Sequence, residues 1–322
     1  MSIIALGLAD LHINDWPKPE GYNGDRLLHS CRPLDVVGQR AKALGVPILF
    51  SGDLIHKPKA IDNRVLESFI DYYRTYIEDL GVDFIAISGN HDQSQKNTFQ
   101  HKSPSYIKSF SKVFKTLKCV DCETWTNKNI VVCGIPYYTH NKGFNRALKR
   151  HRQTIKGDSR FKILLIHTDL PGATNTAGFE IKESRKIMPN LHEHFREFDL
   201  VLAGHIHKPQ QLARTVIMMG SPGHQNSGDM GMKMGYWEIH NDGVPILVPL
   251  DLPQYKYCNP KLTPPDTYHI YIPHPKKVKE IAEGNFSNSL KKTSIAKNYL
   301  KATGVKSKRK KKALVTLLKE IG

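Results

Sequence analysis

Histidine, aspartate and asparagine recur in five short segments of the 322-residue sequence. The segments are Asp10-Leu-His12, Gly52-Asp53 with His56, Gly89-Asn90-His91-Asp92, His167, and Gly204-His205-Ile-His207. Carboxylate, amide and imidazole groups without thiolates suit Mn²⁺, with Mg²⁺ or Fe²⁺ as alternatives. Seven such side chains can hold two ions if one carboxylate bridges them, and two ions can activate water for attack on a phosphate ester.

Each segment taken alone is a weak signal. A single histidine beside a strand is usually a satisfied or exposed imidazole. Two histidines in His205-x-His207 would face opposite sides of a strand, so they need a turn, which Gly204 favours. Gly89-Asn90-His91-Asp92 is more specific, with roughly one chance match per 500 chains of this length. The main evidence for a functional site is therefore the position that these segments share in the predicted fold.

That position is the end of apolar runs that predict buried strands. Asp10, Asn90, His167 and His205 come directly after such runs, and Asp53 follows its run closely. The carboxyl ends of strands in an open α/β sheet are where ligands collect. We therefore expect the polar segments to meet at one edge of the fold.

The elements that must position these residues follow an α/β pattern. We expect strands over residues 3–9, 46–50, 84–87, 130–135, 163–166, 200–203, 216–219, 236–239 and 246–248. We expect helices over residues 33–44, 61–80, 145–154 and 191–198. After Pro249 proline recurs, which indicates a linker with small appended elements. The apolar spacing of residues 311–321 predicts a terminal amphipathic helix.

The order and spacing of the five segments resemble those of the calcineurin-like metallophosphoesterases. More narrowly, they are similar to the SbcD-type DNA double-strand-break repair nuclease subunits, including the phage versions. His56 lies three residues after Asp53, and Met219-Gly220-Ser221-Pro222 follows the second histidine pair, as in those nucleases. The resemblance covers about residues 1–250 and implies a four-layer sandwich of two mixed sheets flanked by helices. Residues 251–322 would form a small capping or linker appendage with a basic tail.

The resemblance also implies roles for individual residues. Asp10, His12 and His207 would bind one ion, Asn90, His167 and His205 the other, and Asp53 would bridge the two. His91 would protonate the leaving group or stabilise the transition state, with Asp92 orienting it. His56 would contact the phosphate or help to place the DNA strand, unless it is an ordinary loop histidine. Independently of the resemblance, Tyr137 and Tyr138 follow a strand and could stack on bases, but packing in the core or at its rim is the favoured interpretation.

Charge is spread unevenly along the chain. The formal net charge is +17, of which +11 falls in residues 276–322. A basic run within that tail predicts DNA contacts, although such a run can also be a solvated segment. The run consists of Lys306, Lys308, Arg309, Lys310, Lys311 and Lys312. With DNA as a partner, the resemblance implies an SbcC-type coiled-coil ATPase that docks on the terminal helix, and the homodimer that family members often form.

Composition limits the location and class of the protein. No apolar run is long enough for a membrane span, and residues 3–9 lack the flanks of a secretion signal. Five cysteines, odd in number, are typical of a reducing compartment, so we expect a bacterial cytoplasm, or host cytoplasm for a phage protein. Cys119 and Cys122 have no second pair for zinc, so we expect reduced thiols there.

Two alternatives to a DNA exonuclease or endonuclease remain open. A phosphomonoesterase or a cyclic-nucleotide phosphodiesterase would use the same two ions and the same scaffold. A non-catalytic binding module would retain only the fold, but such proteins usually lose ligand residues, and every ligand position is filled here.

Overall fold

The protein is described by a computed structural model covering residues 2–18, 22–57, 59–94, 103–184, 186–258 and 269–273. The chain divides into two units, residues 1–273 and residues 274–322. All of the described residues belong to the first unit. The basic run from Lys306 to Lys312 and the expected helix over residues 311–321 lie outside the described residues.

The first of two large sheets has six strands in the order β12-β11-β1-β2-β3-β4. Strands β1 to β4 run parallel, whereas β11 runs antiparallel to both β1 and β12. Their bounds are β1 (Ile3–Leu8), β2 (Ile48–Phe50), β3 (Phe84–Ala86), β4 (Leu117–Cys119), β11 (Gly235–His240) and β12 (Pro245–Pro249). Because parallel strands end at the same edge, the loops after β1, β2 and β3 are neighbours.

The second sheet also has six strands, in the order β5-β6-β7-β8-β10-β9. Strands β6, β7, β8 and β10 are parallel, and the outer strands β5 and β9 pair antiparallel with their neighbours. Their bounds are β5 (Thr124–Thr126), β6 (Ile130–Ile135), β7 (Phe161–His167), β8 (Leu200–Gly204), β9 (Gln210–Ala213) and β10 (Val216–Met218).

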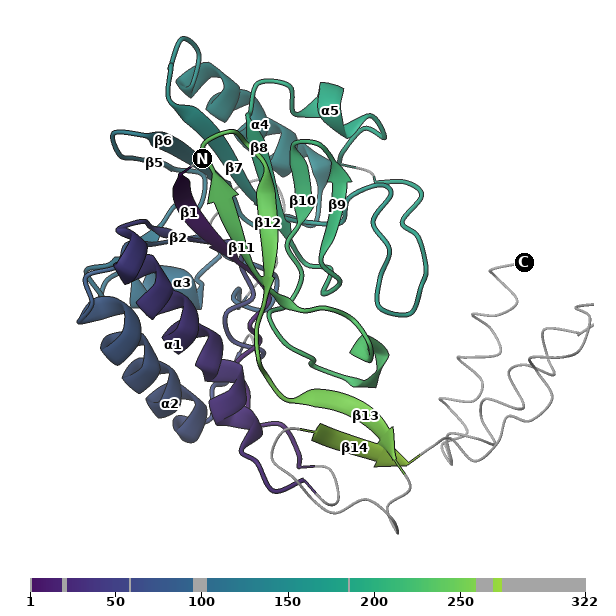
Figure 1. Ribbon diagram of the computed structural model, residues 1–322. Helices are drawn as coiled ribbons and strands as arrows, with labels where there is room; N and C mark the ends of the chain where they lie inside the picture. Colours follow the sequence, from purple (N-terminus) through teal and green to yellow (C-terminus); the bar gives the residue numbers. More distant parts are fainter. Residues whose placement is uncertain are drawn as a thin grey trace, which may run out of the picture. The chain divides into compact units, whose positions relative to one another are not determined.

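Three apolar cores join these sheets and the helices into four layers. One core lies between the sheets and includes Leu49, Ile85, Leu165 and Leu202. A second packs α1 (Arg26–Leu44), α2 (Asn63–Tyr73), the π-helical turn η1 (Arg74–Glu78) and α3 (Tyr106–Phe110) on the first sheet. A third packs α4 (Asn141–Thr154) and α5 (Leu191–His194) on the second sheet. The two-sheet sandwich flanked by helices (Figure 1) confirms the predicted fold class.

Helix α1 begins seven residues earlier than we expected. Proline favours the first turn of a helix, so Pro33 suggested a start, yet it lies inside the helix. The helix begins after Asp25, whose side chain accepts hydrogen bonds from the backbone N–H groups of Leu27 and Leu28. A buried stripe that includes Leu27 and Cys31 fixes this extra length against the first sheet, which outweighs the hydrogen bond lost at Pro33.

One further expectation, for a helix, needs correction, and the expectation of small appended elements after Pro249 gains detail. The helix expected over residues 191–198 ends at His194, because Phe195 leaves the helical conformation with φ at −119°. Within the proline-rich segment, β13 (Gln254–Cys258) and β14 (His269–Pro273) pair in parallel, so part of this segment is a small sheet. Its residues Tyr255 and Ile270 pack with Tyr22 from the loop before α1. The domain boundary after residue 250 stays a prediction.

The start of α1 can be tested through its cap. Replacing Asp25 with alanine leaves the N–H groups of Leu27 and Leu28 without their acceptor, so we expect a loss of about 1 kcal/mol in the free energy of unfolding. Asp25→Asn keeps a capping oxygen and should retain most of the stability. Urea unfolding of both variants checks this. If the two variants lost the same stability, the lost ion pair with Arg64, and not the cap, would explain the effect.

Candidate metal centre

The structure brings the seven predicted ligand residues together at the carboxyl ends of five strands. Asp10 and His12 follow β1, Asp53 follows β2, and Asn90 follows β3, all in the first sheet. The second sheet supplies the rest, with His167 at the end of β7 and both His205 and His207 after β8. Both sheets therefore contribute side chains to one cluster, as the strand-end pattern predicted.

His12 is the centre of the first half of this cluster. Its Nε2 atom lies 3.2 Å from Nε2 of His207 and 4.0 Å from Oδ1 of Asp10. Potential ligand atoms of these three residues lie within 4.8 Å of one another. His12 and Asp10 are buried, and burial lowers the pKa of both His12 and His207. Two neutral imidazoles and a carboxylate thus present their lone pairs to a common point, which suits a divalent cation.

Asn90 is the centre of the second half. Its Oδ1 atom lies 3.0 Å from Nε2 of His167 and 2.9 Å from Nδ1 of His205. Asp53, His167 and His205 also have potential ligand atoms within 4.8 Å of one another. Amide oxygen, carboxylate and imidazole donors therefore converge at a second point.

Asp53 touches both halves through one oxygen atom. Its Oδ2 lies 3.4 Å from Nε2 of His12 and 3.3 Å from Nε2 of His167. The other oxygen, Oδ1, accepts a hydrogen bond of 2.8 Å from the backbone N–H of His91. An oxygen held between two sets of ligand atoms is where a bridging carboxylate of a two-ion site would lie.

Hydrogen bonds to the outer ring nitrogens orient two of the histidines. Nδ1 of His167 lies 2.6 Å from the carbonyl oxygen of Ser51 and must donate to it, which leaves Nε2 facing Asp53 and Asn90. His205 instead turns Nε2 toward Oδ1 of Asp169, at 3.3 Å, and Nδ1 toward Asn90. Such outer partners fix the tautomer of a metal-binding histidine, so these contacts fit a metal centre.

The backbone of the cluster is strained. Among the described residues, five that are not glycine have positive φ angles, and four of these belong to the cluster: Asp10, His12, Asp53 and His205. A left-handed conformation is unfavourable for residues with a side chain and persists only where the surroundings enforce it. Here it bends the chain sharply after β1, β2 and β8.

Asp92 holds the loop that carries Asp53. We expected Asp92 to orient His91, but its carboxylate accepts hydrogen bonds of 2.7 Å and 2.8 Å from the backbone N–H groups of Asp53 and Gly89. It also accepts a hydrogen bond of 2.9 Å from Leu54. Gly89 has no room for a side chain, because a Cβ atom there would lie 2.1 Å from Oδ1 of Asp53. Asp92 is therefore a positioning residue for the loops after β2 and β3.

The turn at Met219-Gly220-Ser221-Pro222 supports His207. The backbone N–H of Ser221 donates to the carbonyl oxygen of His207 at 2.9 Å. Gly220 has a φ angle of +72°, and a Cβ atom there would lie 2.7 Å from that same carbonyl oxygen. The glycine thus permits the close approach that fixes the backbone of His207.

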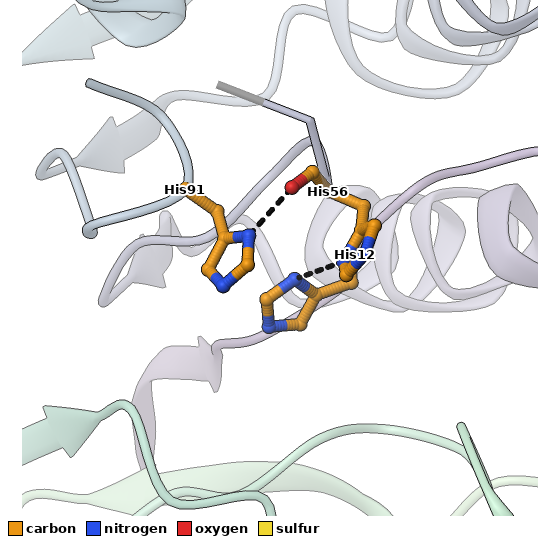
Figure 2. A group of neighbouring side chains, drawn as sticks. All are labelled: His12, His56 and His91. Atoms are coloured by element: carbon orange, nitrogen blue, oxygen red, sulfur yellow. Dashed lines mark hydrogen bonds between the residues drawn. The ribbon is translucent and has the colours of Figure 1, made fainter. Parts of the chain in front are cut away.

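His56 and His91 lie beside the first half of the cluster (Figure 2). Nδ1 of His91 lies 2.5 Å from the backbone carbonyl oxygen of His56, so it donates a hydrogen bond there. The His56 ring stacks on His91 and its Nδ1 lies 3.3 Å from Nδ1 of His12. Burial and the nearby His91 lower the pKa of His56 to about 4, which keeps it neutral at pH 7.

Burial sets the charges inside the cluster. It raises the pKa of Asp10 to about 7, although the charge of His167 opposes this shift. Burial alone would also raise the pKa of Asp53, but His167 and His12 hold it well below its ordinary value. His167 responds in the opposite direction, because Asp53 and Asp10 outweigh burial and raise its pKa to about 9. The buried carboxylates therefore attract positive charge to this point.

Sequence patterns missed several residues around the cluster. Asp169 contacts His205, and the amide of Gln225 donates to the carbonyl oxygen of Asp10 at 2.5 Å. The Trp16 ring lies 4.4 Å from that of His56, and Nζ of Lys186 lies 4.7 Å from the Tyr137 ring. Asp169 comes two residues after His167, so its position at the end of a strand could have indicated a role in the cluster. The contacts of Gln225, Trp16 and Lys186 join residues far apart in the sequence, which no local pattern indicates.

Tyr137 and the cysteines occupy places that ordinary packing accounts for. The ring of Tyr137 lies 5.7 Å from the His205 ring and 6.2 Å from the His167 ring, at the rim of the cluster. Cys119 and Cys122 are free thiols, and burial raises the pKa of both, so they stay protonated. None of the helices in the described ranges has the length and apolar character needed to cross a membrane.

The family model for calcineurin-like phosphoesterases matches residues 7–209, which include all seven ligand-type residues, His56 and His91. The chain belongs to this family. Its members are metal-dependent hydrolases of phosphoesters that use two divalent metal ions, and the two groups of histidine and aspartate described above fit such a site. No curated protein sequence matches the chain.

Three solved structures are similar to the chain at low sequence identity. A Staphylococcus aureus protein described as a 5′-nucleotidase, in complex with α-ketoglutarate, is 14% identical with a TM-score of 0.44; the match covers 76% of this chain and 52% of that one. A dimetal phosphatase from Danio rerio is 11% identical with a TM-score of 0.44, covering 74% and 92%. A hypothetical protein from Thermus thermophilus is 12% identical with a TM-score of 0.40, covering 76% and 96%.

Metal binding by this family member should release a proton. With a pKa of about 9, His167 is a doubly protonated imidazolium at pH 7 in the metal-free protein. A metal ion needs the lone pair on Nε2, so the proton on that nitrogen must leave. The proton competes with the metal below that pKa, so we expect tighter Mn²⁺ binding at pH 8 than at pH 6.5. Calorimetry in two buffers of different ionisation enthalpy measures the release. Affinity that does not change with pH, without proton release, would contradict this charge assignment.

Proposed function

We propose that this phosphoesterase is the nuclease subunit of a DNA-processing complex, an exonuclease with or without endonuclease activity. The observation that carries the proposal is the convergence of seven ligand-type side chains at the carboxyl ends of strands from both sheets, in a chain of net charge +17. A strongly basic chain suits a polyanionic substrate, because binding it releases counterions. Supporting this branch of the family, His56 lies beside His12 and the Gly-Ser-Pro turn holds His207.

In the proposed site, Asp10, His12 and His207 would hold one ion, Asn90, His167 and His205 would hold the other, and both ions would share Asp53. Mn²⁺ is the preferred ion, because the donor set mixes carboxylate and amide oxygens with imidazoles and has no thiolate. When bound, two divalent ions supply activated water at neutral pH and neutralise charge on the phosphate.

His91 is the proposed proton donor. Because its Nδ1 donates to the carbonyl oxygen of His56, Nε2 is the atom left to transfer a proton to the leaving oxygen. His56 holds His91 through that carbonyl, and in this proposal its own ring would contact the substrate phosphate. The positive charge of a protonated His91 would also stabilise the transition state.

The proposed partners and location follow from the same branch of the family. They are an SbcC-type coiled-coil ATPase docked on the terminal helix, a second copy of the chain, and DNA held by the basic run from Lys306 to Lys312. A cytoplasmic location, in a bacterium or in the host of a phage, completes this proposal.

The main alternative is a phosphomonoesterase or cyclic-nucleotide phosphodiesterase that uses the same site. Chemistry at the metal centre does not separate these activities, because each needs an activated water and a proton donor. The difference lies in the rest of the substrate: a polymer engages charges far from the site, and a mononucleotide does not.

Two substitutions separate the chemical step from metal binding. His91→Ala removes the proposed proton donor, so it should lower kcat on DNA by roughly 10²–10⁴-fold while Mn²⁺ binding persists. Asp53→Ala removes the atom shared by both ion sites, so it should lose Mn²⁺ binding itself. Calorimetry and DNA cleavage rates measure the two effects. A His91→Ala protein that cleaves DNA as fast as the parent would refute the role of His91.

Substrate choice tests the proposed function directly. We expect the protein with Mn²⁺ to degrade labelled linear duplex DNA and to be inhibited by EDTA, and to act more slowly on p-nitrophenyl phosphate and cyclic nucleotides. Adding a candidate ATPase subunit should increase the rate on DNA. Fast turnover of the monoester or a cyclic nucleotide, with no DNA cleavage in Mn²⁺, would favour the alternative.

A further inference from the structure

A hollow of about 620 Å³ opens between residues 106–112, which include α3, and α4, outside the metal centre. We call it the α3–α4 cleft. Lys108 and Lys112 line it from the α3 segment, and Arg146 and Arg150 line it from α4. None of these four residues belongs to the metal centre, and they bring four positive charges to one concave surface.

Ion pairs explain only part of the charge of α4, in which Arg152 pairs with Glu197 at 3.0 Å. The helix contains five lysines and arginines and no acidic residue between Asn141 and Thr154. Its buried face is apolar apart from His151, whereas Lys142, Arg146, Lys149 and Arg150 lie on the exposed face. Arg146 and Arg150 are four residues apart, where like charges repel and weaken a helix. Among the described residues, neither of these arginines forms an ion pair with an acidic side chain.

Two acidic residues, Asp121 and Glu123, also line the cleft. Asp121 is buried, and its carboxylate accepts hydrogen bonds of 2.7 Å and 2.6 Å from the backbone N–H and the hydroxyl of Ser88. Its negative charge therefore serves the loop after β3. Glu123 is exposed, so four basic and two acidic side chains leave the cleft with a net charge of +2, which favours an anion.

The cleft and the metal centre share a wall. Tyr138 lines the cleft, and the preceding residue, Tyr137, lies against the rings of His205 and His167. The backbone N–H of Tyr137 donates to the carbonyl oxygen of Ser88 at 2.9 Å, and Ser88 comes two residues before Asn90. A chain of phosphates that passes through the metal centre would therefore reach the cleft by crossing Tyr137.

From this placement we infer that the α3–α4 cleft binds the DNA backbone that continues from the nucleotide being cleaved. The four cations neutralise successive phosphates, and the aromatic wall at Tyr137 separates this track from the reacting phosphate. The inference rests on the proposed nuclease function. It assigns a DNA contact to the folded domain itself, independent of the basic run at residues 306–312.

The test compares two double variants of the full-length protein with the same change in charge. Arg146→Glu with Arg150→Glu alters the cleft. Lys42→Glu with Lys128→Glu, at exposed positions near the opposite ends of the parallel strands, is the control. Each protein is assayed with Mn²⁺ on labelled linear duplex between about 50 and 200 mM salt. Each is also assayed on bis(p-nitrophenyl) phosphate, a diester too small to reach the cleft.

We expect the cleft variant to raise the KM for DNA by roughly tenfold or more and to flatten its salt dependence by about one unit of slope per lost phosphate contact. Its rate on the small diester should match the parent, and the control variant should keep both activities. The milder Arg146→Gln with Arg150→Gln should show a smaller change of the same kind.

Equal effects of the cleft and control variants on DNA would overturn the inference, because only net charge would then matter. Equal loss on DNA and on the small diester in both cleft variants would also overturn it, since the arginines would then support the fold or the metal centre. Failure of the proposed function looks different: the parent protein would hydrolyse the small diester but no DNA.

Discussion

The carboxylate of Asp53 is the interaction on which the rest of the site depends. One of its oxygens lies 3.4 Å from His12 and 3.3 Å from His167, so it joins two groups of ligand atoms that otherwise share no side chain. A buried carboxylate is costly unless positive charge and hydrogen bonds compensate it. The raised pKa of His167, to about 9, reflects this demand, and two divalent cations would meet it more fully. The site is therefore built to hold positive charge before any substrate arrives.

Each half of the cluster also needs both sheets. Asp10 and His12 from the first sheet meet His207 from the second, and Asn90 meets His167 and His205. The apolar core between the sheets fixes their separation, and close-packed interiors deform little. Left-handed backbone conformations after β1, β2 and β8 then turn the ligands toward one another. These conformations are unfavourable in free energy, and packing of the surrounding sheets holds them in place. Loss of core packing should thus weaken metal binding without touching a ligand.

The apolar runs predicted an α/β protein and most of its strands, because buried parallel strands appear as continuous apolar runs, and the family resemblance implied the two-sheet sandwich. They also predicted which residues would meet, since ligand-type residues at strand ends share one edge. They failed where tertiary contacts decide. Asp25 and a buried stripe start α1 well before Pro33. The partners of Asp92 and Asp169 were missed for the same reason, since no local pattern indicates a contact between distant loops.

The arrangement also explains why the metal centre alone does not define the substrate. The chemistry of this family acts on a phosphate and the atoms next to it, which monoesters and diesters share. Selectivity for a polymer must come from surfaces that a small substrate does not reach. The described part of the chain offers one such surface in the basic α3–α4 cleft, reached across Tyr137. The backbone of Ser88 bonds to Tyr137 and to Asp121 of the cleft, and Ser88 lies in the loop that carries Asn90. The same loop therefore supports both the cleft and the metal centre.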